Sequence, residues 1–512
     1  GIDKMKYSSL KCWDANGREL RAFFETPTLP SPLRGRQEGV NSFSIVVNDE
    51  GAVYPITIDP LSTNPSWTAE SDQVSALFGN SVSTAGDVNG DGYSDVIVAS
   101  DRFDNGQTDE GRIYVYYGSA TGLSAAANWT AESDQASARM GFSVSTAGDV
   151  NGDGFSDMIA SAVLYDNGSA NEGGVFVWYG SASGLGANGT IANADWTAES
   201  NQTTAQLGWS VSTAGDVNGD GYSDVIAGAK LYDNGQTDEG RVFIWFGSAL
   251  GPVANGTPLN ADWSAESNQA NANFGISVST AGDVNGDGYS DVIIGSQDYD
   301  NGQTDEGRTF LWFGSATGPT ANGTPLNANW SGESNQADAS YGNSVATAGD
   351  INGDGYSDII IGASLYDNVQ TDEGRVYIYN GSSTGPSLSA NRTIEINQDS
   401  ANFGNCVAPA GDIDGDGYSD VIIGAPNFDS LQNNEGRAYA YFGSAAGLSS
   451  SAGWTQRSNQ ADANFGQSVV TAGDINGDGY SDVLVGAPFY DNGQSDEGRA
   501  FVYNGSPAGL ST

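Results

Sequence analysis

Seven copies of a nine-residue acidic motif carry the clearest chemistry in this sequence. In the first copy, residues 87–95, side-chain oxygens stand at positions 1, 3, 5 and 9, supplied by Asp87, Asn89, Asp91 and Asp95. Glycine at positions 4 and 6 permits a tight turn that gathers these oxygens, and the carbonyl at position 7 adds a fifth. Oxygen ligands in a flexible loop suit Ca²⁺, which takes about six to eight of them, better than Mg²⁺.

The same positions are filled in every copy, so the sequence predicts about seven Ca²⁺ ions, one per repeat, with a structural role. Ordinary Asx turns without a metal are the alternative, which seven complete copies disfavour. An EF-hand is excluded because Val98 stands where that motif needs a glutamate. The sixth copy holds a fourth carboxylate, Asp414, and should bind Ca²⁺ most tightly if charge count sets affinity. The predicted ligands, with position 7 contributing its carbonyl, are Asp87, Asn89, Asp91, Tyr93, Asp95, Asp149, Asn151, Asp153, Phe155, Asp157, Asp216, Asn218, Asp220, Tyr222, Asp224, Asp283, Asn285, Asp287, Tyr289, Asp291, Asp350, Asn352, Asp354, Tyr356, Asp358, Asp412, Asp414, Asp416, Tyr418, Asp420, Asp474, Asn476, Asp478, Tyr480 and Asp482.

The elements that position these loops are short strands. The motif recurs every 62 to 67 residues, which defines seven units across residues 63–512. Each unit holds four short β-branched or aromatic runs, in the first unit at 81–85, 95–99, 112–118 and 129–132, separated by Gly, Asn, Asp and Ser. This pattern predicts an all-β fold, a seven-bladed β-propeller of four-stranded blades.

The two ends of the repeat region indicate how the ring closes. A strand beginning at Trp67 precedes the first acidic motif, and the last unit ends without such a strand. We therefore expect the Trp67 strand to complete the last blade. Residues 1–62 lack the repeat and are expected to form a small β-hairpin element or the tail of an upstream domain, with turn signals at Asp14–Gly17 and Asn48–Gly51.

Composition excludes several classes of function. The chain has 64 Asp and Glu against 18 Lys and Arg, a formal charge of −46, which disfavours nucleic-acid partners. It has no histidine, which removes His-dependent triads and the usual zinc sites. No apolar run reaches the ~18 residues of a membrane helix, so no membrane insertion is expected. Cys12 and Cys406 allow at most one internal disulfide, and the sequence does not decide whether they pair.

Two further repeated features have both a structural and a functional interpretation. The loops between strands two and three repeat acidic residues and an arginine, as in Asp233, Asp238, Glu239 and Arg241; solvated turns with Glu–Arg pairs are favoured over a cation-binding ring. Tryptophans recur at a constant distance before each Phe-Gly position, which favours packing between blades over stacking on sugars. Arg392 takes the tryptophan position in blade six, when the blades are numbered in sequence order.

The repeats resemble a known family. Phe-Gly, the acidic motif and a Gly-Ala-Pro element are similar to FG-GAP repeats, the blades of the integrin α-subunit propeller. The match is fullest in the last two units, with Phe403–Gly404 followed by Gly424–Pro426, and Phe465–Gly466 followed by Gly486–Pro488. Other units depart from it: the phenylalanine is replaced by Met140, Leu207 and Tyr341. The close mutual similarity of the blades resembles bacterial surface proteins more than an animal integrin.

The resemblance implies an extracellular or cell-surface module, with Ca²⁺ in the strand 1–2 hairpins, that serves adhesion or assembly through protein partners. A glycan-binding, lectin-like propeller is the alternative. A hydrolase or lyase using paired carboxylates is the least favoured class, since no aspartate pair differs from its siblings in the other repeats, and we expect no enzyme. The ligand and the oligomeric state are not specified by the sequence.

Overall fold

The computed structural model describes residues 65–252 and 254–511, together with the backbone of five short strands before them. The chain divides into two compact units, residues 1–64 with 511–512, and residues 65–510. No helix in the described part of the chain is long and apolar enough to cross a membrane.

The five strands of the first unit form two small antiparallel sheets. β1 pairs with β2 and β5, and β3 pairs with β4. The first predicted turn, 14–17, lies between the paired strands β1 and β2. β4 pairs with β3 and β5 pairs with β1, while the hairpin turn predicted at 48–51 lies outside the described residues. The bounds are β1 (Lys11–Trp13), β2 (Glu19–Leu20), β3 (Ala22–Glu25), β4 (Ser44–Val47) and β5 (Thr57–Asp59).

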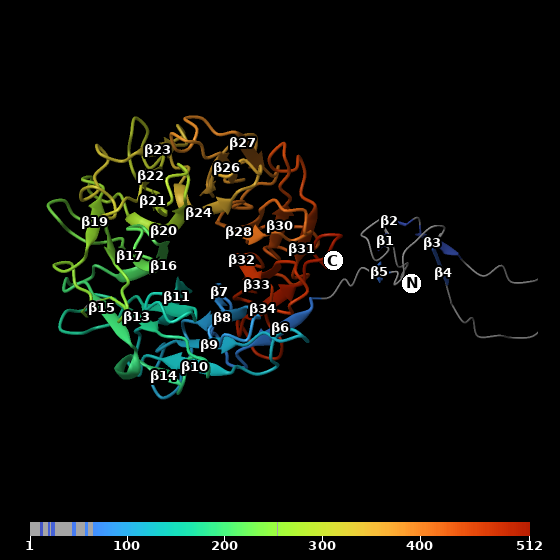
Figure 1. Ribbon diagram of the computed structural model, residues 1–512, viewed down its shortest axis with the longest axis horizontal. Coiled ribbons are helices and arrows are strands. Elements are labelled where there is room, and N and C mark those ends of the chain that lie inside the picture. Colours follow the sequence, from blue (N-terminus) through green and yellow to red (C-terminus); the bar gives the residue numbers. More distant parts are fainter. Residues whose placement is uncertain are drawn as a thin grey trace, which may run out of the picture. The chain divides into compact units, whose positions relative to one another are not determined.

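The second unit is a ring of seven antiparallel four-stranded blades, as predicted (Figure 1). The first strand of each blade packs against the first strands of both neighbouring blades around the centre of the ring. One short strand, β14 (Gly189–Thr190), and one 3-10 turn, η1 (Ile191–Asn193), lie in a connecting loop. The blades, from first to seventh and from inner to outer strand, are β7 (Ser81–Gly86), β8 (Asp95–Ser100), β9 (Arg112–Tyr116), β10 (Trp129–Glu132); β11 (Met140–Gly148), β12 (Asp157–Ala162), β13 (Gly174–Trp178), β15 (Trp196–Glu199); β16 (Leu207–Gly215), β17 (Asp224–Ala229), β18 (Arg241–Trp245), β19 (Trp263–Glu266); β20 (Phe274–Gly282), β21 (Asp291–Ser296), β22 (Arg308–Trp312), β23 (Trp330–Glu333); β24 (Tyr341–Gly349), β25 (Asp358–Ala363), β26 (Arg375–Tyr379), β27 (Arg392–Glu395); β28 (Cys406–Gly411), β29 (Asp420–Ala425), β30 (Arg437–Tyr441), β31 (Trp454–Arg457); and β32 (Ser468–Gly473), β33 (Asp482–Ala487), β34 (Arg499–Tyr503), β6 (Trp67–Glu70).

The ring closes through a strand from the start of the propeller sequence. β6 pairs antiparallel with β34, with Trp67 opposite Val502 and Glu70 opposite Arg499. The last blade is therefore assembled from both ends of the chain, which confirms the predicted closure. In the other blades too, the strand that precedes an acidic motif completes the blade before it. The strand of Arg392 is therefore the outer strand of blade five, and its placement in blade six from sequence order was wrong.

The core lies between blades. The second strand of every blade is buried along its whole length, consistent with its continuous apolar sequence. Trp129, 1% exposed, packs edge-to-face on Trp178 of the next blade, with ring centroids 5.4 Å apart. Trp196 and Trp263 make the same contact with Trp245 and Trp312. These tryptophans are packing residues, as predicted, and their faces are not open to a sugar.

Candidate metal centre

The seven acidic motifs form the hairpin loops between the first and second strands of the blades. In blade one, β7 ends at Gly86 and β8 begins at Asp95, so positions 1 to 8 lie in the turn and position 9 opens the second strand. Gly90 and Gly92 have φ angles of 70° and 90°, a left-handed backbone that favours glycine. The turn therefore forms because glycine occupies these two positions.

Hydrogen bonds within the turn fix the first three ligand positions. Both carboxylate oxygens of Asp87 accept main-chain N–H groups, Oδ1 from Gly90 at 2.7 Å and Oδ2 from Gly92 at 2.8 Å. Oδ1 of Asn89 accepts the N–H of Asp91 at 2.9 Å, and Oδ1 of Asp91 accepts the N–H of Tyr93 at 3.1 Å. Asp87 Oδ1 also accepts the N–H of Asp91 at 3.1 Å, whereas Asp87 Oδ2 and the Oδ1 atoms of Asn89 and Asp91 retain lone-pair capacity for a further partner. The loop is thus an ordered series of Asx turns held by its own side-chain oxygens.

Position 9 is the buried anchor of the loop. Asp95 is completely buried; its Oδ2 accepts the N–H of Val88 at 3.0 Å, and its Oδ1 accepts the N–H of Gly118 at 2.9 Å. Burial raises the pKa of this carboxyl to about 7, and the nearby carboxylates of Asp91 and Asp87 add to the rise. Position 9 is equally buried, with a raised pKa, in the other blades, at Asp157, Asp224, Asp291, Asp358, Asp420 and Asp482.

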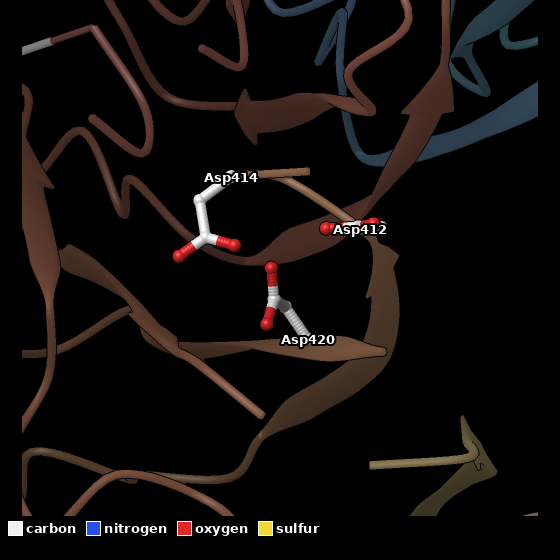
Figure 2. Close-up of side chains that lie close together, drawn as sticks. All are labelled: Asp412, Asp414 and Asp420. Atoms are coloured by element: carbon white, nitrogen blue, oxygen red, sulfur yellow. The ribbon is translucent and has the colours of Figure 1, made fainter. Parts of the chain in front are cut away.

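The loop of blade six brings three carboxylates together (Figure 2). One oxygen each of Asp412, Asp414 and Asp420 lies within 4.8 Å of the others, and no other such group of His, Cys, Asp or Glu occurs among the described residues. The position-3 carboxylate, Asp414, is what distinguishes this loop from its six siblings, which carry Asn there. An all-oxygen donor set of this charge fits a hard divalent cation such as Ca²⁺, which would offset the mutual repulsion of the carboxylates.

The seven loops are joined to one another. The main-chain carbonyl at position 1 of each loop accepts the N–H of the serine at position 8 of the next loop, as between Asp87 and Ser156 at 3.0 Å. The aromatic ring at position 7 also packs against the neighbouring loop, where a Cβ added to Gly90 would lie 2.5 Å from the ring of Phe155. The candidate metal loops therefore form one connected structure on one face of the ring.

The loops between strands two and three contain residues that the sequence interpretation missed. Glu239, taken as part of a solvated turn, is completely buried, and this part of the interpretation is wrong. Its Oε1 accepts the N–H of Asn234 at 2.7 Å, Oε2 has no hydrogen-bond partner in the described structure, and burial raises the pKa. Arg241 does tie adjacent strands, through Glu266 at 3.8 Å. The missed signal was a glutamate at this position in all seven units, namely Glu110, Glu172, Glu239, Glu306, Glu373, Glu435 and Glu497.

Comparison with protein families agrees with this architecture. The family model described as FG-GAP repeat matches six segments, residues 78–116, 207–245, 274–312, 341–379, 403–441 and 465–503. The chain belongs to the FG-GAP repeat family. The equivalent segment of blade two, residues 140–178, lies outside these matches, yet it forms the same strands as its neighbours. Blade two of this chain therefore keeps the blade architecture with Met140 in place of the first phenylalanine.

The curated relatives of this FG-GAP protein include integrin α-subunits. The chain is 37% identical to integrin alpha-4 of Xenopus laevis over 156 residues, 29% of this chain and 14% of the integrin. It is 32% identical to integrin alpha-V of Gallus gallus over 226 residues, 42% of this chain and 20% of the integrin. Phosphatidylinositol-glycan-specific phospholipase D of Bos taurus is 36% identical over 171 residues, 31% of this chain and 20% of that enzyme. The matches span no more than a fifth of each of these three relatives.

Proposed function

We propose that this chain is a calcium-stabilised binding module that engages protein partners outside the cell or at its surface. The observation that carries the calcium part is the convergence of Asp412, Asp414 and Asp420 in a loop whose pattern recurs in all seven blades. Positions 1, 3, 5 and 9 of each loop, with the carbonyl of position 7, are the proposed ligands. Bound Ca²⁺ supplies positive charge where three or four acidic or amide oxygens meet.

The geometry supports a structural role for the ions. The position-9 carboxylate links the metal loop to the end of the third strand, as Asp420 does through the Gly443 N–H at 2.8 Å. An ion held by the loop would therefore also stiffen the strand 3–4 connection. Because each loop contacts the next, order in one loop would favour order in its neighbours.

A binding role is supported over catalysis by the uniformity of the acidic residues. Every loop aspartate except Asp414 has counterparts in the other blades, and Asp414 takes the place of a proposed asparagine ligand, so no pair is singled out as an acid and a base. The integrin relatives support a protein-interaction role, and the phospholipase D relative is matched over 20% of its length, the same share as integrin alpha-V. The glycan alternative loses its main support because most of the repeated tryptophans are packed between blades.

Thermal unfolding of the full chain in EDTA, followed by back-titration with CaCl₂ or MgCl₂, tests the calcium part. We expect the midpoint to fall in EDTA and to rise with free Ca²⁺ by mass action, with a much weaker response to Mg²⁺. A midpoint that EDTA leaves unchanged would refute calcium stabilisation. A glycan array tests the binding class: dissociable binding to a defined sugar, lost on substitution of exposed aromatic residues, would replace the protein-binding proposal by the lectin alternative.

A further inference from the structure

Three blades have an extra segment added to their outer edge. β14 pairs in parallel with β10 of blade one, with Gly189 opposite Ala131. Isolated parallel bridges place Gly256 opposite Ala198 on β15, and Gly323 opposite Ala265 on β19. All three segments come from the strand 3–4 loop of the following blade, in the three longest repeats. The extra residues of these repeats thus cover the exposed edge of the preceding blade.

The added segment fits its edge through main-chain bonds and a glycine. Gly256 donates its N–H to the Thr197 carbonyl at 2.7 Å, and its own carbonyl accepts the Glu199 N–H at 3.0 Å. A Cβ on Gly256 would lie 2.6 Å from the Ala198 Cβ and 2.7 Å from the Trp196 ring. The edge therefore selects an extended segment with glycine at the bridging position.

The outer strand of blade seven offers the same edge without the added segment. β6 has the sequence Trp-Thr-Ala-Glu, identical to β10 and β15, and is the last strand of its sheet. By this correspondence, the Thr68 carbonyl and the Glu70 N–H take the places of the Thr197 and Glu199 groups, and no main-chain hydrogen bond from outside the blade reaches them in the described structure. The Trp67 Nε1 donates to the Ser124 carbonyl at 3.0 Å, but no residue of that shorter loop pairs with β6.

A cavity occupies the place of the missing segment. It has a volume of about 510 Å³ and runs along β6 to blade one, with Ala69, Tyr114, Ala126 and Thr130 among its lining residues. Trp67 is only half-buried beside it, whereas Trp330 and Trp454, on edges that also lack an added segment, are 5% and 3% exposed. β6 is therefore the edge at which the packing is incomplete. We call this cavity and the β6 edge the β6 groove.

We infer that the β6 groove binds an extended, glycine-containing peptide segment of a partner protein, which adds to β6 as a parallel strand with its glycine opposite Ala69. The chain's own Ala-Asn-Gly-Thr segments fill this place on other blades, and they indicate the chemistry that the partner segment needs. Its side chains are expected to be small and uncharged, as they are in the chain's own Ala-Asn-Gly-Thr segments, and the groove's Arg499 is already paired with Glu70 at 3.8 Å. The inference rests on the protein-binding role proposed above and gives it a partner chemistry.

A labelled peptide with the sequence of residues 252–262 tests the groove on the full chain. We expect saturable binding, and protection of the Glu70 amide region from hydrogen exchange. The same peptide with Gly256→Val should bind at least about tenfold more weakly, because the added side chain meets the edge strand and its tryptophan. Absence of peptide binding by protein whose calcium-dependent midpoint is intact would overturn the groove and leave the general binding module standing.

Protein variants locate the bound peptide. Ala126→Trp, at an exposed lining position, should fill the groove and abolish binding, whereas Ala120→Trp, exposed in the same loop but outside the lining, should not. Both variants should keep the wild-type thermal midpoint. Equal binding by the two variants, or by the two peptides, would overturn the inference. Conversion of a wild-type dimer into a monomer by Ala126→Trp alone would also overturn it, since the occupant would then be a second copy of this chain.

Discussion

The main-chain N–H of Ser94 donates to the main-chain carbonyl of Asp474 at 3.0 Å, although the two residues belong to the first and last acidic loops of the propeller. This bond completes a closed circle of seven equivalent hydrogen bonds that joins each loop to the next. The circle gives the loops a shared geometry, so a disturbance of one loop is passed to its neighbours. The pairs are Ser94–Asp474, Ser156–Asp87, Ser223–Asp149, Ser290–Asp216, Ser357–Asp283, Ser419–Asp350 and Ser481–Asp412.

Exchange of carboxylate and amide at position 3 should reset calcium affinity. Asp414→Asn gives blade six the ligand set of its siblings, and we expect its site to weaken by about tenfold, ~1.4 kcal/mol, because ligand charge tunes affinity. Asn476→Asp in blade seven should create a second tight site. Isothermal titration calorimetry would measure both. A tightest class of sites that Asp414→Asn leaves unaltered would contradict the assignment.

The buried position-9 aspartates predict the pH dependence of the protein without divalent cations. The pKa of Asp95 is about 7 and that of Asp224 about 8 in the folded chain, above the ordinary value of 3.8 because burial disfavours the charged form. The folded state therefore holds more protons than the unfolded state between these values. The stabilising contribution of these protonated carboxyls is fully present below about pH 4 and is lost as pH rises through about 7 to 8. In EDTA, the thermal midpoint should fall from about pH 5 to about pH 8.

The same scan in saturating CaCl₂ is the control. A bound dication favours ionised ligands, so the calcium-induced rise in midpoint should grow as pH increases over this interval. An EDTA midpoint that rises with pH would show that the position-9 carboxylates are not held in a desolvated site.

The fold followed from the sequence because its local signals agree with one another. Alternating apolar runs separated by glycine and asparagine predicted the strands, and the unpaired strand at Trp67 predicted the closure that β6 and β34 make. What escaped prediction depends on contacts between blades. Glutamate side chains are usually exposed, and the burial of Glu239 results from the packing of neighbouring segments around it.

For the candidate site, the sequence indicated which residues of one loop group together, but not the contacts between loops. The spacing of Asp412, Asp414 and Asp420 indicated a common site, which the structure supports by their proximity. The bonds from loop to loop could not be predicted, since they depend on where the next blade lies. The extra residues of the long repeats lie in the strand 3–4 loops, and their pairing with the preceding blade could not be predicted because it depends on the edge of that blade.

Removal of the closing strand should weaken the whole ring. Deletion of residues 63–72 removes β6 and exposes the edge of β34. It also removes the contact between Trp67 and Tyr116 of blade one, whose ring centroids are 4.8 Å apart. We expect a loss of more than about 3 kcal/mol of unfolding free energy. Deletion of residues 1–62, which retains β6, is the matched control and should cost far less. Urea denaturation would compare them; equal losses, or an unchanged midpoint in the first variant, would contradict closure by β6.

Arg392 marks a position in blade five where a larger side chain should stabilise the protein. Its Nη1 donates to the Leu448 carbonyl at 2.7 Å, as the Trp330 Nε1 does to the Ser387 carbonyl at 3.0 Å, so the arginine reproduces the tryptophan's hydrogen bond. It does not fill the tryptophan's volume, and a cavity of about 220 Å³ remains beside it.

Arg392→Trp should therefore fill this cavity while keeping a donor for the Leu448 carbonyl. We expect a gain of about 1 kcal/mol in unfolding free energy from the apolar surface it buries. Arg392→Ala should instead lose about 1–2 kcal/mol, because it removes both the hydrogen bond and the packing of the arginine stem. Urea denaturation of the three proteins in calcium would measure the order. If Arg392→Trp were less stable than Arg392→Ala, the outer strand of blade five would not share the packing geometry of its neighbours.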